Sequence, residues 1–274
     1  MAQPDNKLRI PETLRKVKNI IGIFSAKGGV GKSAISLQIA LALKEKGFKV
    51  GLVDADIYGP SQPVMLNSAA GELKLTQDKI IEPLQKEGIK FISMGLISDE
   101  KMPVIWRGPM VSGAVMQLLS QTEWGELDFL VVDTPPGTGD VQLTLLQRIP
   151  LTSAIVVTTP QKVAISDCKK GIEMINKLDV PISGLIENMS WFQPDDSEKR
   201  YYLFGKDGGK DLSKEYSLDL LAQLPLVELD EDSNIQNNPL LQKEFAKISD
   251  KLTTSIKNLK EKKSTGIPQI NIIK

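Results

Sequence analysis

The feature that most constrains this chain is the glycine-rich segment AKGGVGKS at residues 26–33. An apolar run at 20–24 precedes it and a second apolar run at 34–41 follows it, an order that predicts a strand, a turn and a helix. Three glycines let the backbone curl until successive N–H groups point inward, and the dipole of the new helix adds positive charge at the same place. The segment therefore predicts a phosphate-binding loop.

This loop pattern assigns roles to individual residues. Lys32 would reach the β- and γ-phosphates of a nucleotide, and Ser33 would offer its hydroxyl to Mg²⁺. The residues expected to contact ATP in this loop are Gly28, Gly29, Val30, Gly31, Lys32 and Ser33. The alternative interpretation is a structural turn that binds no nucleotide.

Apolar stretches and helical patterns alternate along the rest of the chain. Further strands are expected at 50–53, 89–94, 129–132, 154–157, 182–186 and 220–224, and helices at 33–46, 111–121, 163–178 and 239–263. Residues 62–88 give only a weak signal, which is typical of a loop. The alternation predicts a three-layer α/β fold, with a mostly parallel sheet and helices on both of its faces.

The polar ends of the chain indicate its domain organisation. Residues 1–18 carry two prolines and are expected to form an N-terminal arm. Residues 19–263 would form one domain built around the phosphate-binding loop, because α/β folds often hold this length in a single domain. Residues 264–274 are expected to be a flexible tail.

Composition narrows the classes of function. The 34 basic residues balance 34 acidic residues, so no overall charge favours nucleic acid or a membrane surface. Cys168 is the only cysteine and histidine is absent, which excludes an intramolecular disulfide and any histidine ligand or general base. Residues 1–7 carry no apolar signal core, and no stretch of the chain approaches about 18 apolar residues, the length of a membrane span. We therefore expect a cytoplasmic protein without a nucleic-acid partner and without membrane insertion.

Aspartates follow two of the expected strands. Asp54 and Asp56 come after the strand at 50–53, and Asp133 comes after the strand at 129–132. The carboxyl ends of parallel strands meet at the edge that carries the phosphate loop.

Mg²⁺ takes oxygen ligands and keeps several waters, so we assign it to Ser33, Asp54 and Asp133, with Asp133 acting through a bound water. Asp56 would orient the attacking water, while Lys32 and Mg²⁺ stabilise charge on the phosphate oxygens. The catalytic residues expected from this edge are thus Lys32, Asp56 and Asp133. For Asp54 and Asp56, capping of a turn is the alternative.

The order of lysines and glycines from Lys27 to Ser33 resembles the deviant Walker A loop of the MinD, ParA and nitrogenase-iron-protein ATPases. The resemblance implies the fold of these P-loop NTPases and an ATP-dependent homodimer. In such a dimer Lys27 would contact the nucleotide of the partner, which adds Lys27 to the expected ATP-binding and catalytic residues.

Further segments are similar to the Mrp/ApbC family of iron–sulfur cluster carrier ATPases. The segments that carry this resemblance are Asp54–Ser61, Trp106–Met110, Asp133–Asp140, Thr158–Gln161 and Glu187–Ser190. The resemblance implies ATP hydrolysis, which we expect to be slow, and partners that are iron–sulfur assembly proteins or client apoproteins. It also implies that Asn188 recognises the adenine base and that Pro225 lies near it. For Asn188, the alternative is a turn residue.

One departure from that family concerns the cluster itself. Members that hold a cluster carry Cys-x-x-Cys before a Tyr-x-Phe-Gly segment, and here Pro194 and Ser197 fall at the cysteine positions. An iron–sulfur cluster is therefore possible only without its usual ligands, and its ligands stay unassigned. Cys168 lies in a stripe of helical core spacing, so we interpret it as a packing residue rather than a ligand.

Two other functions stay open. A MinD- or ParA-like positioning ATPase would need a membrane helix or a DNA-binding face. The end of the chain carries Pro268 and little charge, which argues against the helix. The lysines that could form a basic face, or only a solvated helix end, are Lys257, Lys260, Lys262 and Lys263. The second function that stays open is a nucleotide-gated scaffold for partner proteins that holds no metal cluster.

Overall fold

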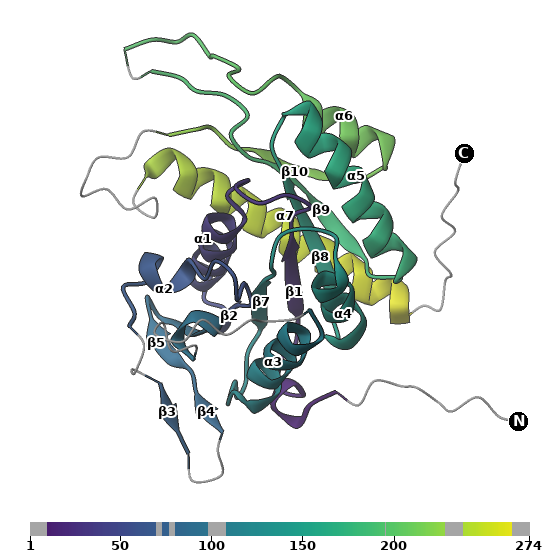
Figure 1. Cartoon of the computed structure of the whole chain (residues 1–274). Helices are drawn as coiled ribbons and strands as arrows, with labels where there is room; N and C mark the ends of the chain where they lie inside the picture. Colours follow the sequence, from purple (N-terminus) through teal and green to yellow (C-terminus); the bar gives the residue numbers. More distant parts are fainter. Residues whose placement is uncertain are drawn as a thin grey trace, which may run out of the picture.

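A parallel sheet forms the centre of the computed structural model, which describes residues 10–69, 73–76, 80–97, 108–194, 196–227 and 238–264. Eight strands lie in the order β10-β9-β8-β1-β7-β2-β6-β5, and β5 runs antiparallel to its neighbour β6 (Figure 1). The strand bounds are β1 Ile20–Phe24, β2 Val50–Asp54, β5 Leu84–Lys86, β6 Ile89–Ser93, β7 Phe129–Asp133, β8 Ser153–Thr158, β9 Ile182–Glu187 and β10 Leu220–Gln223. The predicted three-layer α/β fold is confirmed.

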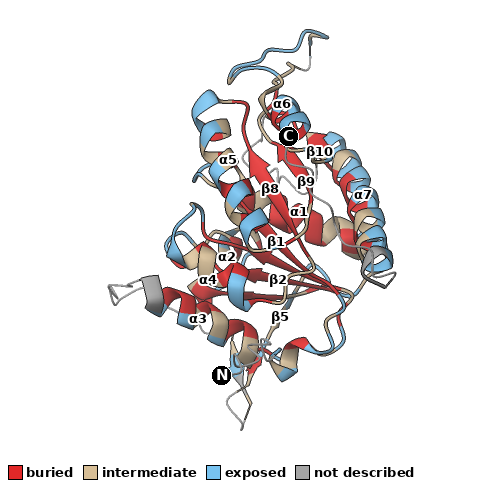
Figure 2. Ribbon diagram, turned by 90° about the vertical axis from the view of Figure 1, so that its right-hand side faces the viewer, coloured by how far each residue is buried: buried red, intermediate tan, exposed pale blue. Residues whose placement is uncertain are grey.

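The four central strands are buried on both faces. Every residue of β1, β2, β7 and β8 is buried, which explains their nearly continuous apolar sequences. Figure 2 shows buried strands, among them β1, β2 and β8, between two groups of helices whose outer sides are largely exposed.

Helices cover the two faces of the sheet in two separate groups. On one face, α1 Lys32–Glu45 packs with α7 Pro239–Ser264 over a shared apolar core. The opposite face is covered by α3 Gly108–Gln121, α4 Asp140–Arg148, α5 Lys162–Lys177 and α6 Gly208–Glu215. Because helices return the chain to the amino end of the next parallel strand, most of them begin at the carboxyl edge of the sheet, where β1, β2, β7, β8 and β9 end.

The expectation of a loop at 62–88 is wrong. This segment contains α2 Gln62–Met65, a two-stranded hairpin of β3 Lys74–Leu75 and β4 Ile81–Glu82, and β5. Each piece is too short to show a helical or alternating period, so the sequence pattern misses it. For a related reason α4 and α6 were not predicted: each is only two to three turns long and follows glycine or a polar loop.

Residues 10–18 of the expected arm pack against the domain. A short 3-10 turn at Glu12–Leu14 buries Leu14, which is 2% exposed. The Thr13 hydroxyl donates a hydrogen bond to the Ser120 carbonyl at 2.9 Å, and Val17 pairs with Leu127. Residues 1–9 and 265–274 lie outside the described residues, as do Trp106 and Arg107.

Candidate functional site

The glycine loop joins β1 to α1 through two residues in left-handed conformation. Gly29 has φ +77° and Gly31 has φ +83°, values that L-residues rarely adopt. A Cβ atom on Gly31 would lie 2.3 Å from Nδ2 of Asn188, whereas a Cβ on Gly29 would meet nothing within 4 Å. The backbone conformation therefore favours glycine at both positions, and at 31 an added Cβ would in addition displace the Asn188 side chain.

The backbone N–H groups of this loop find no acceptor in the part of the chain that the structure describes. Among the described residues, no group accepts a hydrogen bond from the backbone N–H groups of residues 28–33. They are followed at once by the N-terminus of α1, which adds its dipole. A row of free N–H groups at a helix N-terminus is a cradle for an anion such as a phosphate.

Lys32 lies beneath this cradle in an ion pair with Asp133. Its Nζ contacts Asp133 Oδ1 and lies 3.4 Å from Ser33 Oγ, and the two charged side chains are 5% and 0% exposed. The Ser36 hydroxyl lies 3.0 Å from the same Asp133 oxygen. The structure thus brings Lys32 and Ser33 at the start of α1 together with Asp133 at the end of β7, 101 residues beyond Lys32 along the chain.

Asp54 lies beside this pair with both oxygens already engaged. Its Oδ1 accepts a hydrogen bond from the Asp56 N–H at 3.1 Å. Its Oδ2 accepts hydrogen bonds from the Gln62 N–H at 3.2 Å and the Ser93 hydroxyl at 2.9 Å. Burial, and then the nearby Asp133 charge, raise the pKa of Asp54 to about 7. Its position suits contact with a metal through water better than direct ligation.

Asp56 both caps a turn and faces a cleft. Its Oδ1 accepts hydrogen bonds from the N–H groups of Tyr58 and Gly59, each at 3.2 Å, so the capping alternative is observed. No described group donates to the other oxygen, Oδ2. The side chain is 8% exposed, and burial raises the pKa of Asp56 above its usual value. The free oxygen is available to a water molecule.

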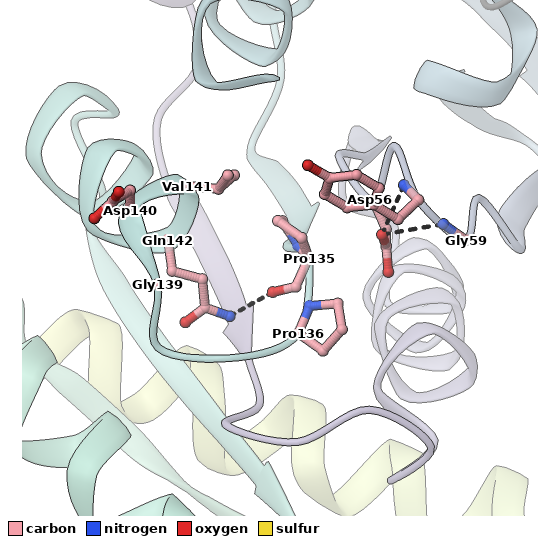
Figure 3. A pocket seen from close by; sticks show the side chains of 9 residues that line it. Asp56, Gly59, Pro135, Pro136, Gly139, Asp140, Val141 and Gln142 are labelled. Carbon is pink, nitrogen blue, oxygen red and sulfur yellow. Dashed lines mark hydrogen bonds between the residues drawn. The ribbon is translucent and has the colours of Figure 1, made fainter. Parts of the chain in front are cut away.

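The cleft beside Asp56 has a volume of about 450 Å³ and separates two loops (Figure 3). One wall is Asp56, Tyr58 and Gly59, and the other consists of Pro135, Pro136 and residues 139–142. The second wall is held in place because Gln142 Nε2 donates a hydrogen bond to the Pro135 carbonyl. The cleft lies at the carboxyl edge of the sheet, and its wall comes near the phosphate loop, since a Cβ atom on Gly28 would lie 3.9 Å from Cγ of Pro136.

Lys27 differs from Lys32 in its surroundings. The Lys27 residue is exposed, and it pairs with no carboxylate in the part of the chain that the structure describes. The structure therefore does not bring Lys27 to the Lys32–Asp133 pair of its own chain.

The residues expected near the adenine base come from two neighbouring loops. The Asn188 side chain reaches the phosphate loop, where its Nδ2 donates a hydrogen bond to the Val30 carbonyl at 2.9 Å. Pro225 is buried, and the residue before it, Leu224, exchanges backbone hydrogen bonds with Glu187 and Ser190 at 2.8 Å each. Asn188 and the Pro225 loop thus lie on one side of the phosphate loop.

A hairpin occupies the place expected for cluster ligands. Phe192 and Tyr201 pair across it, and a turn hydrogen bond of 3.1 Å joins the Ser197 N–H to the Pro194 carbonyl. Exposed cations lie over its rings: Arg200 is 4.0 Å from the centre of Trp191. The pairs Lys199–Tyr201 and Lys206–Tyr202 are similar, at 5.1 and 4.8 Å.

Cys168 lies in the apolar core between α5 and the sheet. It is 1% exposed, and burial raises the pKa of its thiol to about 12. The described residues hold no group of three or more His, Cys, Asp or Glu side chains arranged to bind a metal ion.

Sequence reasoning missed the side chains that hold the aspartates. Gln62 and Ser93 are 0% exposed, as is Ser36, and each lies within hydrogen-bond distance of Asp54 or Asp133. A polar residue in an otherwise apolar stretch is a usable signal for Ser36 and Ser93. Gln62 offered no such signal, because its surroundings in the sequence are polar and loop-like.

Comparisons with known proteins agree with this geometry. Residues 16–260 match a ParA family model described as NUBPL iron-transfer P-loop NTPase. An iron-sulfur cluster carrier protein of Pseudomonas fragi is 47% identical over 215 residues, which are 78% of this chain and 75% of that protein. One of Methanocaldococcus jannaschii is 44% identical over 269 residues, 95% of this chain and 92% of that protein.

Among solved structures, a nucleotide-binding protein from Archaeoglobus fulgidus in complex with ADP is similar. It superposes with a TM-score of 0.69 at 30% identity, and the match covers 88% of this chain and 90% of that chain.

No helix within the described ranges combines the length and the apolar character needed to cross a membrane.

Proposed function

Because this chain belongs to the ParA family of NUBPL-type iron-transfer P-loop NTPases, we propose that it is an ATPase that serves iron–sulfur cluster assembly as a nucleotide-gated homodimer. The observation that carries the ATPase proposal is the row of backbone N–H groups at 28–33, which find no acceptor among the described residues, next to the buried Lys32–Asp133 pair. N–H donors and a buried cation at a helix N-terminus attract the negative charge of a nucleoside triphosphate. We expect the protein to act in the cytoplasm.

The phosphates would bind along the loop. Residues 28–33 would donate their N–H groups to phosphate oxygens. Lys32 Nζ, which contacts Asp133 and lies 3.4 Å from Ser33 Oγ, would turn to the β- and γ-phosphates. Asn188, already bonded to the loop at Val30, would contact the adenine base, with the Pro225 loop beside it.

Mg²⁺ fits the donors of this site if it keeps most of its waters. The Ser33 hydroxyl would be the direct ligand, because it is half-buried at the start of α1 and its oxygen has a second lone pair besides the one that faces Lys32 Nζ at 3.4 Å. Asp54 and Asp133 would hold metal-bound water, since their oxygens already accept hydrogen bonds from the protein. When bound, Mg²⁺ neutralises charge on the phosphate oxygens.

ATP hydrolysis requires the protein to position a water molecule and to stabilise charge, and it needs no covalent bond between the protein and the nucleotide. Asp56 Oδ2 would accept a hydrogen bond from this water. The water oxygen attacks the γ-phosphorus, the bond to the β–γ bridging oxygen breaks, and ADP and inorganic phosphate form with release of the water proton. Lys32, and Lys27 from a second copy, would stabilise the charge that collects on the phosphate oxygens.

Exposed apolar side chains support the homodimer. The connections at the carboxyl edge carry Tyr58, Val64, Ile97, Met110, Val163, Tyr201, Tyr202, Leu203 and Leu240, each at least 40% exposed. Among the described residues, the one other large apolar side chain of this exposure is Ile10. A concentration of exposed apolar surface around a site favours a partner there. The exposed Lys27 lies on the same edge, where a second copy could place it at the other nucleotide.

Any iron–sulfur cluster must be bound by ligands other than the two cysteines of the Cys-x-x-Cys motif. Pro194 and Ser197 supply no thiolate, and Cys168 is buried. We propose that this chain supplies the nucleotide-dependent step of assembly, while thiolates for any cluster come from assembly proteins or client apoproteins. The second candidate function is a nucleotide-gated scaffold that holds no metal cluster. It is favoured by the same observation, because the only cysteine, Cys168, is buried in the apolar core.

One set of measurements tests both parts. ATP hydrolysis is compared between wild type and Lys32→Ala, and cluster transfer from a chemically loaded donor to an apo-ferredoxin is followed with and without the chain and ATP. We expect hydrolysis that Lys32→Ala abolishes, and transfer that accelerates only when both chain and ATP are present. Wild-type protein that neither binds nor hydrolyses ATP would overturn the ATPase. Hydrolysis without any effect on transfer would select the scaffold.

Retention of iron tests the assignment of ligands. After anaerobic reconstitution, iron and acid-labile sulfide per chain are measured for wild type and Cys168→Ser. We expect neither protein to retain a cluster. A stable cluster that is lost in Cys168→Ser would overturn our assignment of Cys168 to the core.

A further inference from the structure

Gln62 joins three parts of the candidate site through one side chain and its own backbone. It is 0% exposed in the first turn of α2. Its Nε2 donates hydrogen bonds to the Ser33 carbonyl at 2.8 Å and to Asp133 Oδ2 at 3.0 Å. Its backbone N–H donates to Asp54 Oδ2 at 3.2 Å. The start of α1 and the ends of β7 and β2 therefore meet at this residue.

The two oxygens of Asp133 are held by different groups. Oδ1 faces Lys32 and Ser36, whereas the partner of Oδ2 is the Gln62 amide. Without that amide, Oδ2 would be a buried carboxylate oxygen without a donor in the described chain, and the carboxylate could rotate about its last bond.

The side-chain oxygen of Gln62 indicates which hydrogen bonds hold the Gln62 amide in place. Gln62 Oε1 is buried and has no hydrogen-bond partner in the described part of the chain. The side chain is therefore held by the two acceptors of Nε2 rather than by anything that its oxygen accepts. Only a group with two hydrogens on one atom can serve both acceptors, which makes glutamine specific here rather than merely polar.

We propose that Gln62 is a positioning residue of the ATPase, which orients Asp133 toward Lys32 and the metal-bound water and couples the segment that follows Asp56 to the phosphate loop. This inference rests on the proposed ATPase function. Gln62 begins α2 directly after the loop at 55–61, so a displacement of that loop is passed through the amide to Asp133 and to Ser33. Gln62 itself need not touch the nucleotide.

The test replaces Gln62 with leucine, which has nearly the same volume but no donor. Gln38→Leu is the matched control: Gln38 is also a buried glutamine, 4% exposed in α1, and its Nε2 has no hydrogen-bond partner among the described groups. Measurements are kcat, KM for ATP, the Mg²⁺ concentration for half-maximal rate, and ATP affinity with and without Mg²⁺.

We expect Gln62→Leu to lower kcat at least tenfold, to change KM less than threefold, and to remove most of the gain in ATP affinity that Mg²⁺ gives wild type. Gln38→Leu should leave all four quantities unchanged. Wild-type kcat and wild-type Mg²⁺ dependence in Gln62→Leu would overturn the proposal.

Two further arms keep the outcome decisive. If Gln62→Leu does not fold, Gln62→Asn replaces it, because its shorter amide stays polar but cannot reach both acceptors; it should show the same loss, and wild-type values would overturn the proposal. If wild type binds ATP without hydrolysing it, the proposed ATPase has failed, and the Mg²⁺-dependent ATP affinity alone decides on Gln62. If Mg²⁺ then increases the ATP affinity of wild type and of the variant by the same factor, the positioning role of Gln62 is overturned.

Discussion

Asp54 and Asp133 lie directly opposite each other in the register of β2 and β7, and both carboxylates are fully buried. One buried cation, Lys32, contacts Asp133 and not Asp54. Two neighbouring carboxylates in a low-dielectric site cannot both ionise without cost. The observed hydrogen bonds divide the roles: Asp133 pairs with the cation, while Asp54 accepts hydrogen bonds and has the raised pKa.

The raised pKa of Asp54 predicts a pH dependence of stability. The pKa is about 7 in the folded protein against 3.8 for the ordinary group, so between these values the folded state holds a proton that the unfolded state has released. From this group, the free energy of unfolding should fall by up to about 1.4 kcal/mol per pH unit as pH rises from about 4 to about 7, and then level off. Urea unfolding of wild type at several pH values measures the slope. Asp54→Asn cannot titrate and should lack this component; equal slopes in both proteins would contradict it.

The phosphate loop allows a comparison of two glycines with similar φ angles. Gly29→Ala meets only the left-handed strain, about 1–2 kcal/mol, because its Cβ enters open space. Gly31→Ala adds a collision with Asn188 and should destabilise by at least about 1 kcal/mol more. Thermal and urea unfolding measure the stabilities, and ADP titration measures affinity. We expect the larger loss of affinity in Gly31→Ala; equal effects would show that Asn188 moves freely away.

Asp56 is expected to act on water rather than on nucleotide affinity. Asp56→Asn should keep the ATP dissociation constant within about threefold and lower kcat by roughly 10²–10⁴-fold, the range for a lost general base or water-orienting group. Asp140→Asn is the control, because Asp140 is an exposed carboxylate at the opposite wall of the same cleft. Hydrolysis by Asp56→Asn at the wild-type rate would exclude this role.

Lys27 is expected to act only between two copies. Lys27→Ala removes an exposed side chain without a carboxylate partner in the described chain, so the free energy of unfolding should change by less than about 0.5 kcal/mol. Light scattering with a non-hydrolysable ATP analogue should show a dimer for wild type and mainly monomer for the variant. A variant that dimerises as wild type does would contradict the role across the interface.

The sequence predicts the parts of this site that depend on local order. Residues 26–31 form the loop that the local sequence predicts between a strand and a helix, and the helix begins at Lys32. Asp54 and Asp133 end strands, so their common edge is predictable from the parallel sheet. Hydrogen-bond partners are different. That Ser93 reaches Asp54 depends on the register of β6 against β2, and that Gln62 reaches Asp133 depends on a single turn of helix in a region without a clear period. Such contacts form only when distant segments meet.

The position of Cys168 has a consequence for the chemistry that this protein can survive. A thiol that is 1% exposed and protonated up to about pH 12 is a poor target for peroxide and for alkylating reagents. Because the chain has no other cysteine, its nucleotide edge carries no sulfhydryl group that air could oxidise. Oxidation of the isolated protein would then fall on an exposed methionine such as Met110, which is 52% exposed, before it reaches a buried one such as Met94, which is 3% exposed. If partner proteins supply the thiolates, as we propose, they would be the oxygen-sensitive component of cluster assembly.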